Sequence, residues 1–454
     1  MPKNFFLVLL VSFVLTLPFF VISADFHVST AGNDTQGDGT SGNPWRTPEF
    51  GAKQLNAGDT LLIHEGTYLL SKDNLPTADA NLMDRVRALV SPAANVTGTS
   101  TNPITIKSAG DGTVFLDAGQ NPEWAAVGTV WGSDFVIIDG LSIRGAAILW
   151  GTKNSLVQNC NIFGGLDTPR SNGGDDFGNV LRVEYCTDCT VKNNILHDNG
   201  LFGETRENSP LIMQYQSTNL LIENNDLFNS VGHGIYMKDT PVNLVFRNNF
   251  VYNNYLSGMQ GGGQGNGADV KIHNNVFLAN NTSNDNEQGG IRLVVWLDGW
   301  EIYNNTFVNN GYASLRNVNV VTDINAWNNI YSTSSNYFYH VGWGGSGATF
   351  SNQWTYSDYN QFYGSANWRE STEWSTLAAY VSATGFDPNS TQQDPGFSNA
   401  NGTNAADFKR AQYTTDGRGG SYSNVKGAYI NGSEQIGSFG VKLTPKKPDN
   451  TLVE

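Results

Sequence analysis

Residues that could bind an acidic group and move a proton recur at alternate positions of several short segments in the middle of the chain. In the segment 234–239, Tyr236 and Lys238 alternate with Ile235 and Met237. A lysine can neutralise a carboxylate or, with a lowered pKa, act as a base, and a tyrosine can act as acid or base. The residues predicted to be catalytic are Lys238, Tyr236, Arg292 and His233. The residues predicted to bind the ligand are Arg182, Glu184, Gln214, Gln260 and Arg316.

A repeated phrase indicates how residues so far apart in the sequence could meet. An apolar residue, a variable residue and Asn-Asn recur every 24 to 34 residues. The copies are 191–194, 222–225, 246–249, 272–275, 302–305 and 326–329, with weaker forms at 137–140 and 157–160. Asparagine tolerates left-handed backbone angles, and its amide can bond to the copies above and below. A repeat of this period predicts an all-β parallel solenoid with one coil per copy.

Counting back from each Asn-Asn aligns one strand of every coil. With a side-chain period of two, the apolar positions point into the core and their neighbours point outward. The inward residues are predicted to be Leu181, Val183, Met213, Ile235, Met237, Met259, Ile291, Leu293 and Leu315. One outward column is predicted to be Arg182, Ile212, Tyr236, Gln260, Arg292 and Arg316. The other is predicted to be Glu184, Gln214, Lys238, Gly262, Val294 and Val318.

The insertions that lengthen some coils all precede this strand. They span residues 167–179, 199–209 and 281–288, and we expect them to wall a groove beside the outward columns. Gly261-Gly262-Gly263 removes side chains beside Lys238 and is predicted to leave room for a bulky ligand. The opposing interpretation is that long cations merely solvate the outer face of a sheet. It is the simpler one for any single residue, but the coincidence of several under loops favours a site.

Charge and the N-terminus limit the classes of partner. Lys plus Arg number 26 against 41 Asp plus Glu, and the net charge of −15 argues against duplex nucleic acid and acidic membranes as partners. Residues 1–24 read as a signal peptide, with Lys3 before an apolar run and Ser23-Ala24 as a cleavage site. A retained N-terminal anchor is the alternative. We expect an exported, monomeric protein, extracellular or periplasmic, with no membrane association after cleavage.

The entry to the repeats resembles a known family. The segments 26–33, 43–48 and 57–68, with a helix expected over 49–55, resemble the N-terminal cap and first coil of secreted right-handed parallel β-helix proteins of the pectate-lyase-like superfamily. The segments 357–360, 394–397 and 427–429 resemble the closing part of such chains. The resemblance implies four regions: a signal peptide (1–24), an N-terminal cap and first coil (25–102), β-helix repeats (103–365) and a C-terminal capping segment (366–454).

The superfamily contains lyases, hydrolases, epimerases and adhesive proteins, so the resemblance is specific for fold and weak for activity. Related lyases use Lys or Arg as bases, some with calcium, which makes β-elimination on an acidic, uronate polysaccharide the expected activity. Gly232-His233-Gly234 and Asp175-Asp176 resemble motifs of polygalacturonase-type hydrolases, but 57 residues separate Asp176 from His233. Paired carboxylates must flank the bond that is cut, within about 5–9.5 Å. Glycoside hydrolysis and non-catalytic carbohydrate binding are the alternatives.

Three further features have weaker functional interpretations. Asp175, Asp176 and Asp239 could bind calcium as hard oxygen ligands, but without an oxygen-rich loop of fixed spacing solvated loop acids are the better explanation. The cysteines at 160, 186 and 189 form no zinc pattern and predict buried thiols or a local disulfide. The tryptophans at 150, 296, 300 and 343 could stack on sugars, but Trp300 precedes an inward-looking strand and is expected in the core.

Overall fold

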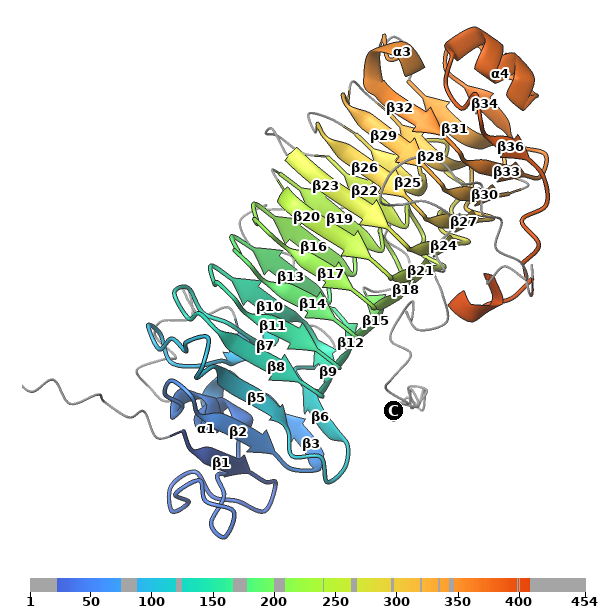
Figure 1. Cartoon of the computed structure of the whole chain (residues 1–454). Coiled ribbons are helices and arrows are strands. Elements are labelled where there is room, and N and C mark those ends of the chain that lie inside the picture. Colours follow the sequence, from blue (N-terminus) through green and yellow to red (C-terminus); the bar gives the residue numbers. More distant parts are fainter. Residues whose placement is uncertain are drawn as a thin grey trace, which may run out of the picture.

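The structure is a computed structural model. It describes residues 23–74, 88–119, 125–165, 178–199, 209–239, 241–262, 268–294, 298–318, 321–333, 335–342, 347–397, 399 and 401–408. In these residues the chain winds into coils that stack along one axis, from β1 at the lower end of Figure 1 to α4 at the upper end. The predicted signal peptide lies almost wholly outside the described residues.

Three parallel sheets of 12 strands run the length of the stack. The first sheet contains β1 (Asp25–Val28), β2 (Thr60–Ile63), β5 (Ile104–Ser108), β8 (Val136–Asp139), β11 (Leu156–Gln158), β14 (Thr190–Lys192), β17 (Leu221–Glu223), β20 (Val242–Arg247), β23 (Ala268–His273), β26 (Trp300–Tyr303), β29 (Ile324–Trp327) and β32 (Trp354–Asp358).

The second sheet contains β3 (Gly66–Leu69), β6 (Val114–Asp117), β9 (Ser142–Gly145), β12 (Asn161–Gly164), β15 (Ile195–Asn199), β18 (Asp226–Ser230), β21 (Phe250–Tyr252), β24 (Val276–Leu278), β27 (Thr306–Val308), β30 (Ile330–Ser332), β33 (Gln361–Tyr363) and β36 (Thr391–Gln392). The third sheet contains β4 (Ala88–Val90), β7 (Ala125–Gly128), β10 (Ala147–Trp150), β13 (Leu181–Glu184), β16 (Ile212–Tyr215), β19 (Ile235–Lys238), β22 (Met259–Gly261), β25 (Gly289–Leu293), β28 (Ala313–Asn317), β31 (Tyr337–Val341), β34 (Asn367–Arg369) and β35 (Glu373–Trp374). Among these strands only the β34–β35 pair is antiparallel. The right-handed parallel β-helix expected from the sequence is confirmed.

The Asn-Asn turn joins the first sheet to the second, and its two residues have different roles. The first asparagine of each pair has a left-handed backbone, with φ between 53° and 57° from Asn193 to Asn328. The second forms a ladder through the buried residues Asn194, Asn225, Asn249, Asn275, Asn305, Asn329 and Asn360. Asn275, for example, donates through Nδ2 to Asn305 Oδ1 (3.0 Å) and to the carbonyl of Phe246 (2.9 Å). Both roles that the sequence predicted for asparagine are therefore filled, but by different positions.

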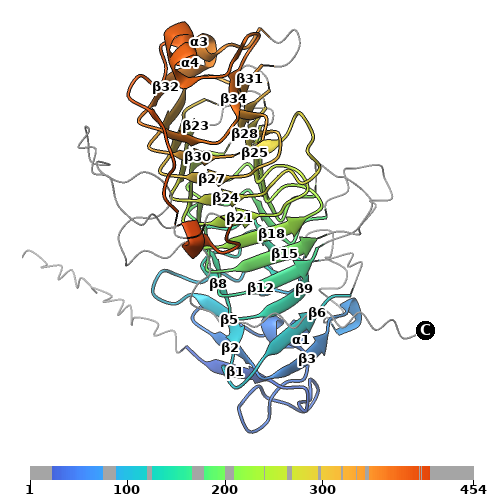
Figure 2. The same ribbon diagram turned by 90° about the vertical axis from the view of Figure 1, so that its right-hand side faces the viewer.

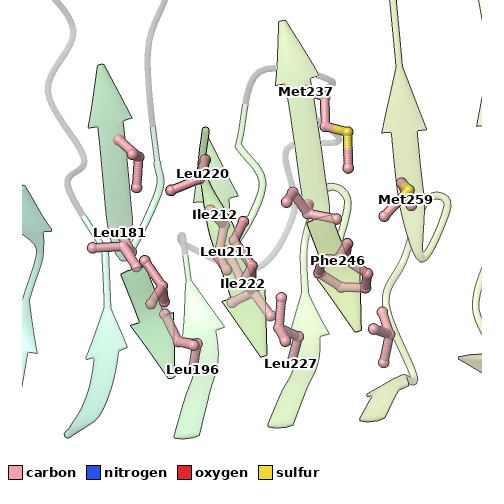
Figure 3. Close-up of a cluster of buried hydrophobic side chains, with 14 of the residues drawn as sticks. Leu181, Leu196, Leu211, Ile212, Leu220, Ile222, Leu227, Met237, Phe246 and Met259 are labelled. Carbon is pink, nitrogen blue, oxygen red and sulfur yellow. The ribbon is translucent and has the colours of Figure 1, made fainter. Parts of the chain in front are cut away.

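The core lies between the three sheets. Figure 3 shows side chains from all three meeting in the interior, among them Leu181, Ile222 and Leu227. Each of these side chains is fully buried, and burial of one such aliphatic side chain contributes roughly 1.5–3 kcal/mol. Repeated over successive coils, this contribution holds the stack together. Trp300 is fully buried, as expected.

Both ends of the stack carry helices. The predicted N-terminal helix is α1 (Pro48–Lys53), with Thr47 as its N-cap. At the other end lie α3 (Phe350–Gln353) and α4 (Leu377–Thr384), both at the top of Figure 2. Tyr380 of α4 is buried among aromatic residues of the last coils. The 3₁₀ turns η1 (Lys72–Asn74) and η2 (Ala405–Phe408) complete the described helices, and none of these helices is long and apolar enough to cross a membrane.

Candidate functional site

Strand β19 presents Tyr236 and Lys238 on the outside of the third sheet. Ile235 and Met237 are fully buried in the core, whereas Tyr236 and Lys238 are half-buried. This is the orientation that the alternation of apolar and polar residues predicts. We use "outer patch" for the outward residues of the third sheet from β13 to β28: Arg182, Glu184, Met213, Tyr215, Tyr236, Lys238, Gln260, Arg292 and Arg316.

The strand register aligns most of the outer patch as predicted. Tyr236 pairs with Gln260, Gln260 with Arg292, and Arg292 with Arg316. Arg182 and Glu184 lie on the same face of β13, two coils from β19. Neighbouring strands are about 4.8 Å apart, so the six coils of the outer patch span about 24 Å along the stack.

The predicted position of Gln214 is wrong. In β16, Ile212 aligns with Ile235 and Gln214 with Met237, so both point inward. The outward residues of this strand are Met213 and Tyr215. Gln214 is fully buried, and the amide oxygen accepts bonds from the backbone N–H groups of Gln216 and Ser217 when the amide is oriented to satisfy both. The predicted inward orientation of Met213 and outward orientation of Ile212 are wrong for the same reason, a slip of one residue in this coil.

Arg182 forms an ion pair with Glu184 two residues along the same strand. Both side chains are more than nine-tenths buried, although they lie on the outer face of the sheet. A buried guanidinium requires a paired carboxylate, and removal of one partner would leave an uncompensated charge. The two side chains therefore depend on one another, and the binding role predicted for them stays a prediction.

Arg292 is held by two neighbours. Its Nη1 donates to Gln260 Oε1 at 2.5 Å, and its Nη2 lies 3.2 Å from Glu287 Oε2. Glu287 belongs to the insertion 281–288, one of those predicted to stand beside the patch. This loop thus folds back over the outer face of β25, and Arg292 is buried beneath it.

Arg316 is only 1% exposed and bonds to backbone carbonyls. Its Nη1 donates to the carbonyls of Asn317, His340 and Gly342, and its Nε donates to that of Asn286 in the same loop. Burial lowers the pKa of Arg316 to about 10. The side chain predicted to bind substrate instead joins β28, the next coil and the loop.

His233 lies in the turn before β19 and is fully buried. Its Nδ1 accepts a bond from the Ser257 N–H at 3.1 Å, which places the proton of the neutral ring on Nε2. Burial and the nearby charge of Arg292 hold the pKa of His233 well below its usual value. A neutral, enclosed imidazole fits a positioning role better than direct proton exchange with a ligand.

No group of three or more candidate metal-ligating side chains occurs in the described residues. Asp239 follows β19 with a left-handed backbone (φ 48°), while Asp175 and Asp176 lie outside the described residues. The predicted calcium site therefore stays a prediction. The three cysteines are free, buried thiols.

Gly261 does not open space beside Lys238 as predicted. It lies in the inward column, and a Cβ at this position would come within 2.3 Å of the Trp300 ring. The absent side chain makes room for the Trp300 indole in the core, and Gly263 lies outside the described residues.

The sequence analysis missed aromatic residues at the ends of the patch strands. Tyr215 is the last residue of β16 and pairs with Lys238. Trp150, which the sequence analysis did suggest for sugar stacking, is the last residue of β10 and pairs with Glu184. Tyr185 directly follows β13, and Trp131 lies in the loop after β7. An aromatic residue at or just after the end of successive aligned strands was the signal that could have revealed them. We call Trp131, Trp150, Tyr185 and Tyr215 the aromatic row.

Comparisons with known proteins agree with the fold. A family model described as "Right handed beta helix region" matches residues 206–355. No curated protein matches the sequence. The chain is a right-handed parallel β-helix, the fold that the resemblance of the N-terminal segments implied.

Solved structures cover most of the chain at low identity. Pectate lyase Pel9A is 15% identical, covers 92% of this chain and 96% of its own, and has a TM-score of 0.52. A rhamnogalacturonan lyase is 13% identical over 82% of this chain and 87% of its own, with a TM-score of 0.44. A GH136 lacto-N-biosidase from Eubacterium ramulus is 11% identical over 82% of this chain and 67% of its own, with a TM-score of 0.41. At these identities the likeness concerns the fold.

Proposed function

We propose that this protein is an exported enzyme that cleaves an acidic, uronate-containing polysaccharide by β-elimination at Tyr236 and Lys238. The observation that carries the proposal is that these two side chains share the half-buried outer face of β19, between coils that bear Arg182 and Arg292. The outer patch holds the cations Arg182, Lys238, Arg292 and Arg316 on a molecule whose net charge is −15, and Glu184 and Glu287 pair with two of them. A local excess of positive charge is what a polyanionic ligand needs on an acidic protein.

Elimination requires a neutralised carboxylate, a base for the C5 proton and a proton for the leaving oxygen. In the proposed mechanism the Lys238 ammonium neutralises the uronate carboxylate. The Tyr236 oxygen, as phenolate, takes the C5 proton. The C4–C5 double bond forms as the C4–O bond breaks, and the Tyr236 hydroxyl then returns that proton to the leaving oxygen. Nearby cations favour the phenolate form of a tyrosine.

Hydrolysis has less support from the geometry. A hydrolase needs two carboxyl groups facing one bond, about 5–9.5 Å apart. On the described outer patch, the carboxylate of Glu184 is committed to Arg182 and buried with it. Carbohydrate binding without cleavage is the stronger alternative, because Arg292 and Arg316 are engaged within the protein and Trp131 and Tyr185 of the aromatic row are exposed.

The test is incubation of the purified protein with alginate, pectate and glycosaminoglycans. We expect one of them to yield a product with the ultraviolet absorbance of an unsaturated uronate. New reducing ends without that absorbance would indicate hydrolysis and contradict elimination. Retention of the protein on a polysaccharide, with neither product, would support the binding alternative.

A further inference from the structure

We infer that the aromatic row is a binding platform for pyranose rings, and that the bound polysaccharide lies along the axis of the coils, across the strands. This inference rests on the proposed function and adds to it the orientation and length of the ligand. The platform joins the outer patch directly, because Tyr215 of the row pairs with Lys238.

The four rings contact one another in the order Trp150, Trp131, Tyr185 and Tyr215, and each is turned by 58–78° from the next. Trp131 and Trp150 have centroids 5.4 Å apart, Trp131 and Tyr185 5.7 Å, and Tyr185 and Tyr215 5.3 Å. From Trp150 in β10 to Lys238 in β19 the row advances three coils, or about 14 Å. A row of this length can contact several sugar rings in line.

Large parts of these rings face solvent. Trp131 is 55% exposed and Tyr185 is 41% exposed, and both belong to the few large exposed hydrophobic residues of the described chain. Exposed aromatic rings beside polar groups are characteristic of a ligand site. Aromatic rings offer a flat apolar face to the C–H groups of a sugar, while Tyr and Trp also keep a polar group at the rim.

The backbone of Tyr185 is left-handed at the point where its ring is exposed. The positions that follow Trp150, Glu184, Tyr215 and Lys238 are equivalent in the stack and hold Gly151, Tyr185, Gln216 and Asp239. All four have left-handed backbones, with φ of 57°, 54°, 45° and 48°, and Tyr185 is the bulkiest residue among them. Gly and Asp adopt this conformation at little cost, but a bulky tyrosine does so at a penalty. A strained residue whose ring is exposed is a candidate for function rather than for packing.

The Trp131 ring packs directly over Gly151. A Cβ at residue 151 would lie 2.3 Å from Cε3 of the Trp131 ring, so the indole occupies the volume that a side chain would fill. The Trp131 ring thereby stands one coil from Tyr185, in line with it. Trp131 is placed by the space over Gly151, and Tyr185 by its left-handed backbone, and the two exposed rings lie at consecutive coils.

The proposed occupant is a polysaccharide because the row ends at the cations and the tyrosine of the outer patch. A chain of uronate sugars can place one carboxylate at Lys238 and stack the apolar faces of its next residues on Tyr215, Tyr185 and Trp131. Binding in this direction predicts that long oligosaccharides reach Trp131 and short ones do not.

The experiment compares Trp131→Ala and Tyr185→Asn with Tyr363→Ala. Tyr363 has an exposure similar to that of Tyr185, but it lies in β33 of the second sheet, whereas the row lies along the third sheet. With a hexameric oligouronate of whichever polymer binds, we expect both row variants to weaken binding about tenfold by calorimetry, and Tyr363→Ala to leave it unchanged. With a dimer, the row variants should bind as the unaltered protein does.

A thermal melt separates a binding role from a packing role. Tyr185→Asn should melt at the same temperature as the unaltered protein or higher, because asparagine relieves the left-handed strain. A lower melting temperature with unchanged hexamer binding would overturn the inference. So would an equal loss for dimer and hexamer.

Failure of the platform can be told apart from failure of the proposed function. Affinity electrophoresis in gels that contain pectate, alginate or neutral xylan reports binding whether or not the polymer is cut. Retardation that depends on Trp131, without any unsaturated product, would leave the platform standing and remove the lyase proposal. Cleavage at an unchanged rate in the Trp131 and Tyr185 variants would support the lyase proposal and contradict the platform.

Discussion

At the scale of single residues, the side chains of the outer patch divide into two groups. Arg182, Arg292 and Arg316 are more than nine-tenths buried, and each is bound to a carboxylate, an amide or backbone carbonyls. Tyr236 and Lys238 are half-buried and face outward. Groups of the first kind shape and charge the surface, whereas the second kind, like Tyr215, can contact a polymer directly.

Replacement of Lys238 by Ala should therefore reduce turnover far more than it reduces stability. Loss of the cation that neutralises the carboxylate should lower kcat/KM about 10²–10³-fold, as loss of one preorganised electrostatic group does in other enzymes. Tyr236→Phe should give a similar loss because it removes the atom that carries the proton. The measurement is the rate of unsaturated-uronate absorbance on the active polymer.

Lys192→Ala is the matched control, since Lys192 lies half-buried on the outer face of the first sheet. It should leave the rate within about twofold. Unchanged turnover in Lys238→Ala would remove the proposed site, and an equal effect of Lys192→Ala would indicate that only overall charge matters.

At the scale of elements, the Asn-Asn turn is the unit that sets the coil. The first asparagine bends the chain with a left-handed backbone, and the second bonds to the coils on both sides. The ladder is fully buried, so every amide in it must be satisfied by its neighbours. This explains why the second asparagine recurs even where the rest of the phrase varies.

Asn275→Ala should destabilise the protein strongly. It removes bonds to Phe246 and Asn305 and leaves the Asn249 N–H and amide without the Asn275 acceptor. A buried group left unsatisfied costs about 1–3 kcal/mol, so we expect the unfolding free energy to fall by at least about 2 kcal/mol. Urea denaturation followed by circular dichroism measures the change.

Asn325→Ala serves as the comparison, because Asn325 lies half-buried on the outside of β29 and, among the described residues, its side chain donates to Asp323 next to it in the chain rather than to another coil. Its replacement should cost less than about 0.5 kcal/mol. Equal effects of the two substitutions would show that the ladder contributes nothing special.

At the scale of the whole molecule, stability depends on closing the ends of the stack. An open solenoid end is an exposed sheet edge and core. At the C-terminal end, Tyr380 of α4 packs on Trp368, Phe350 and Tyr339, and the buried carboxylate of Asp387 lies beneath them. Asp387 accepts bonds from Ser357 Oγ, Ser390 Oγ and Asn360 Nδ2.

This buried carboxyl should make the C-terminal cap sensitive to pH. Burial raises the pKa of Asp387 from 3.8 to about 6, so the folded state holds the proton more tightly than the unfolded chain does. The stabilisation from this group is therefore present below pH 4 and lost as the pH rises through about 6. Thermal melts of Asp387→Asn should lack this component, so the difference in melting temperature from the unaltered protein should vary between pH 4 and 7. A constant difference across that range would contradict the prediction.

The sequence by itself determined the fold and most of the outer patch. Asparagine favours the backbone conformation and the side-chain bonds of this turn, so the repeat of Asn-Asn reveals the period of the solenoid from the sequence alone. In β19, apolar residues occupy one parity of the strand, so Tyr236 and Lys238 could only point outward. The same holds for Arg182 in β13 and Arg292 in β25.

Only the tertiary structure decided the rest. Leu211 precedes β16, and Ile212 and Met213 begin it, so both faces of this segment carry apolar residues. Only the pairing with β13 and β19 settles that Gln214 faces inward. The burial of Arg292 and Arg316 depends on the loop 281–288, which bonds to them from another part of its coil. Trp131 meets Tyr185 because two coils of unequal length bring them together over Gly151. Local patterns specify the direction of a side chain, whereas its neighbours across coils depend on register and loop path.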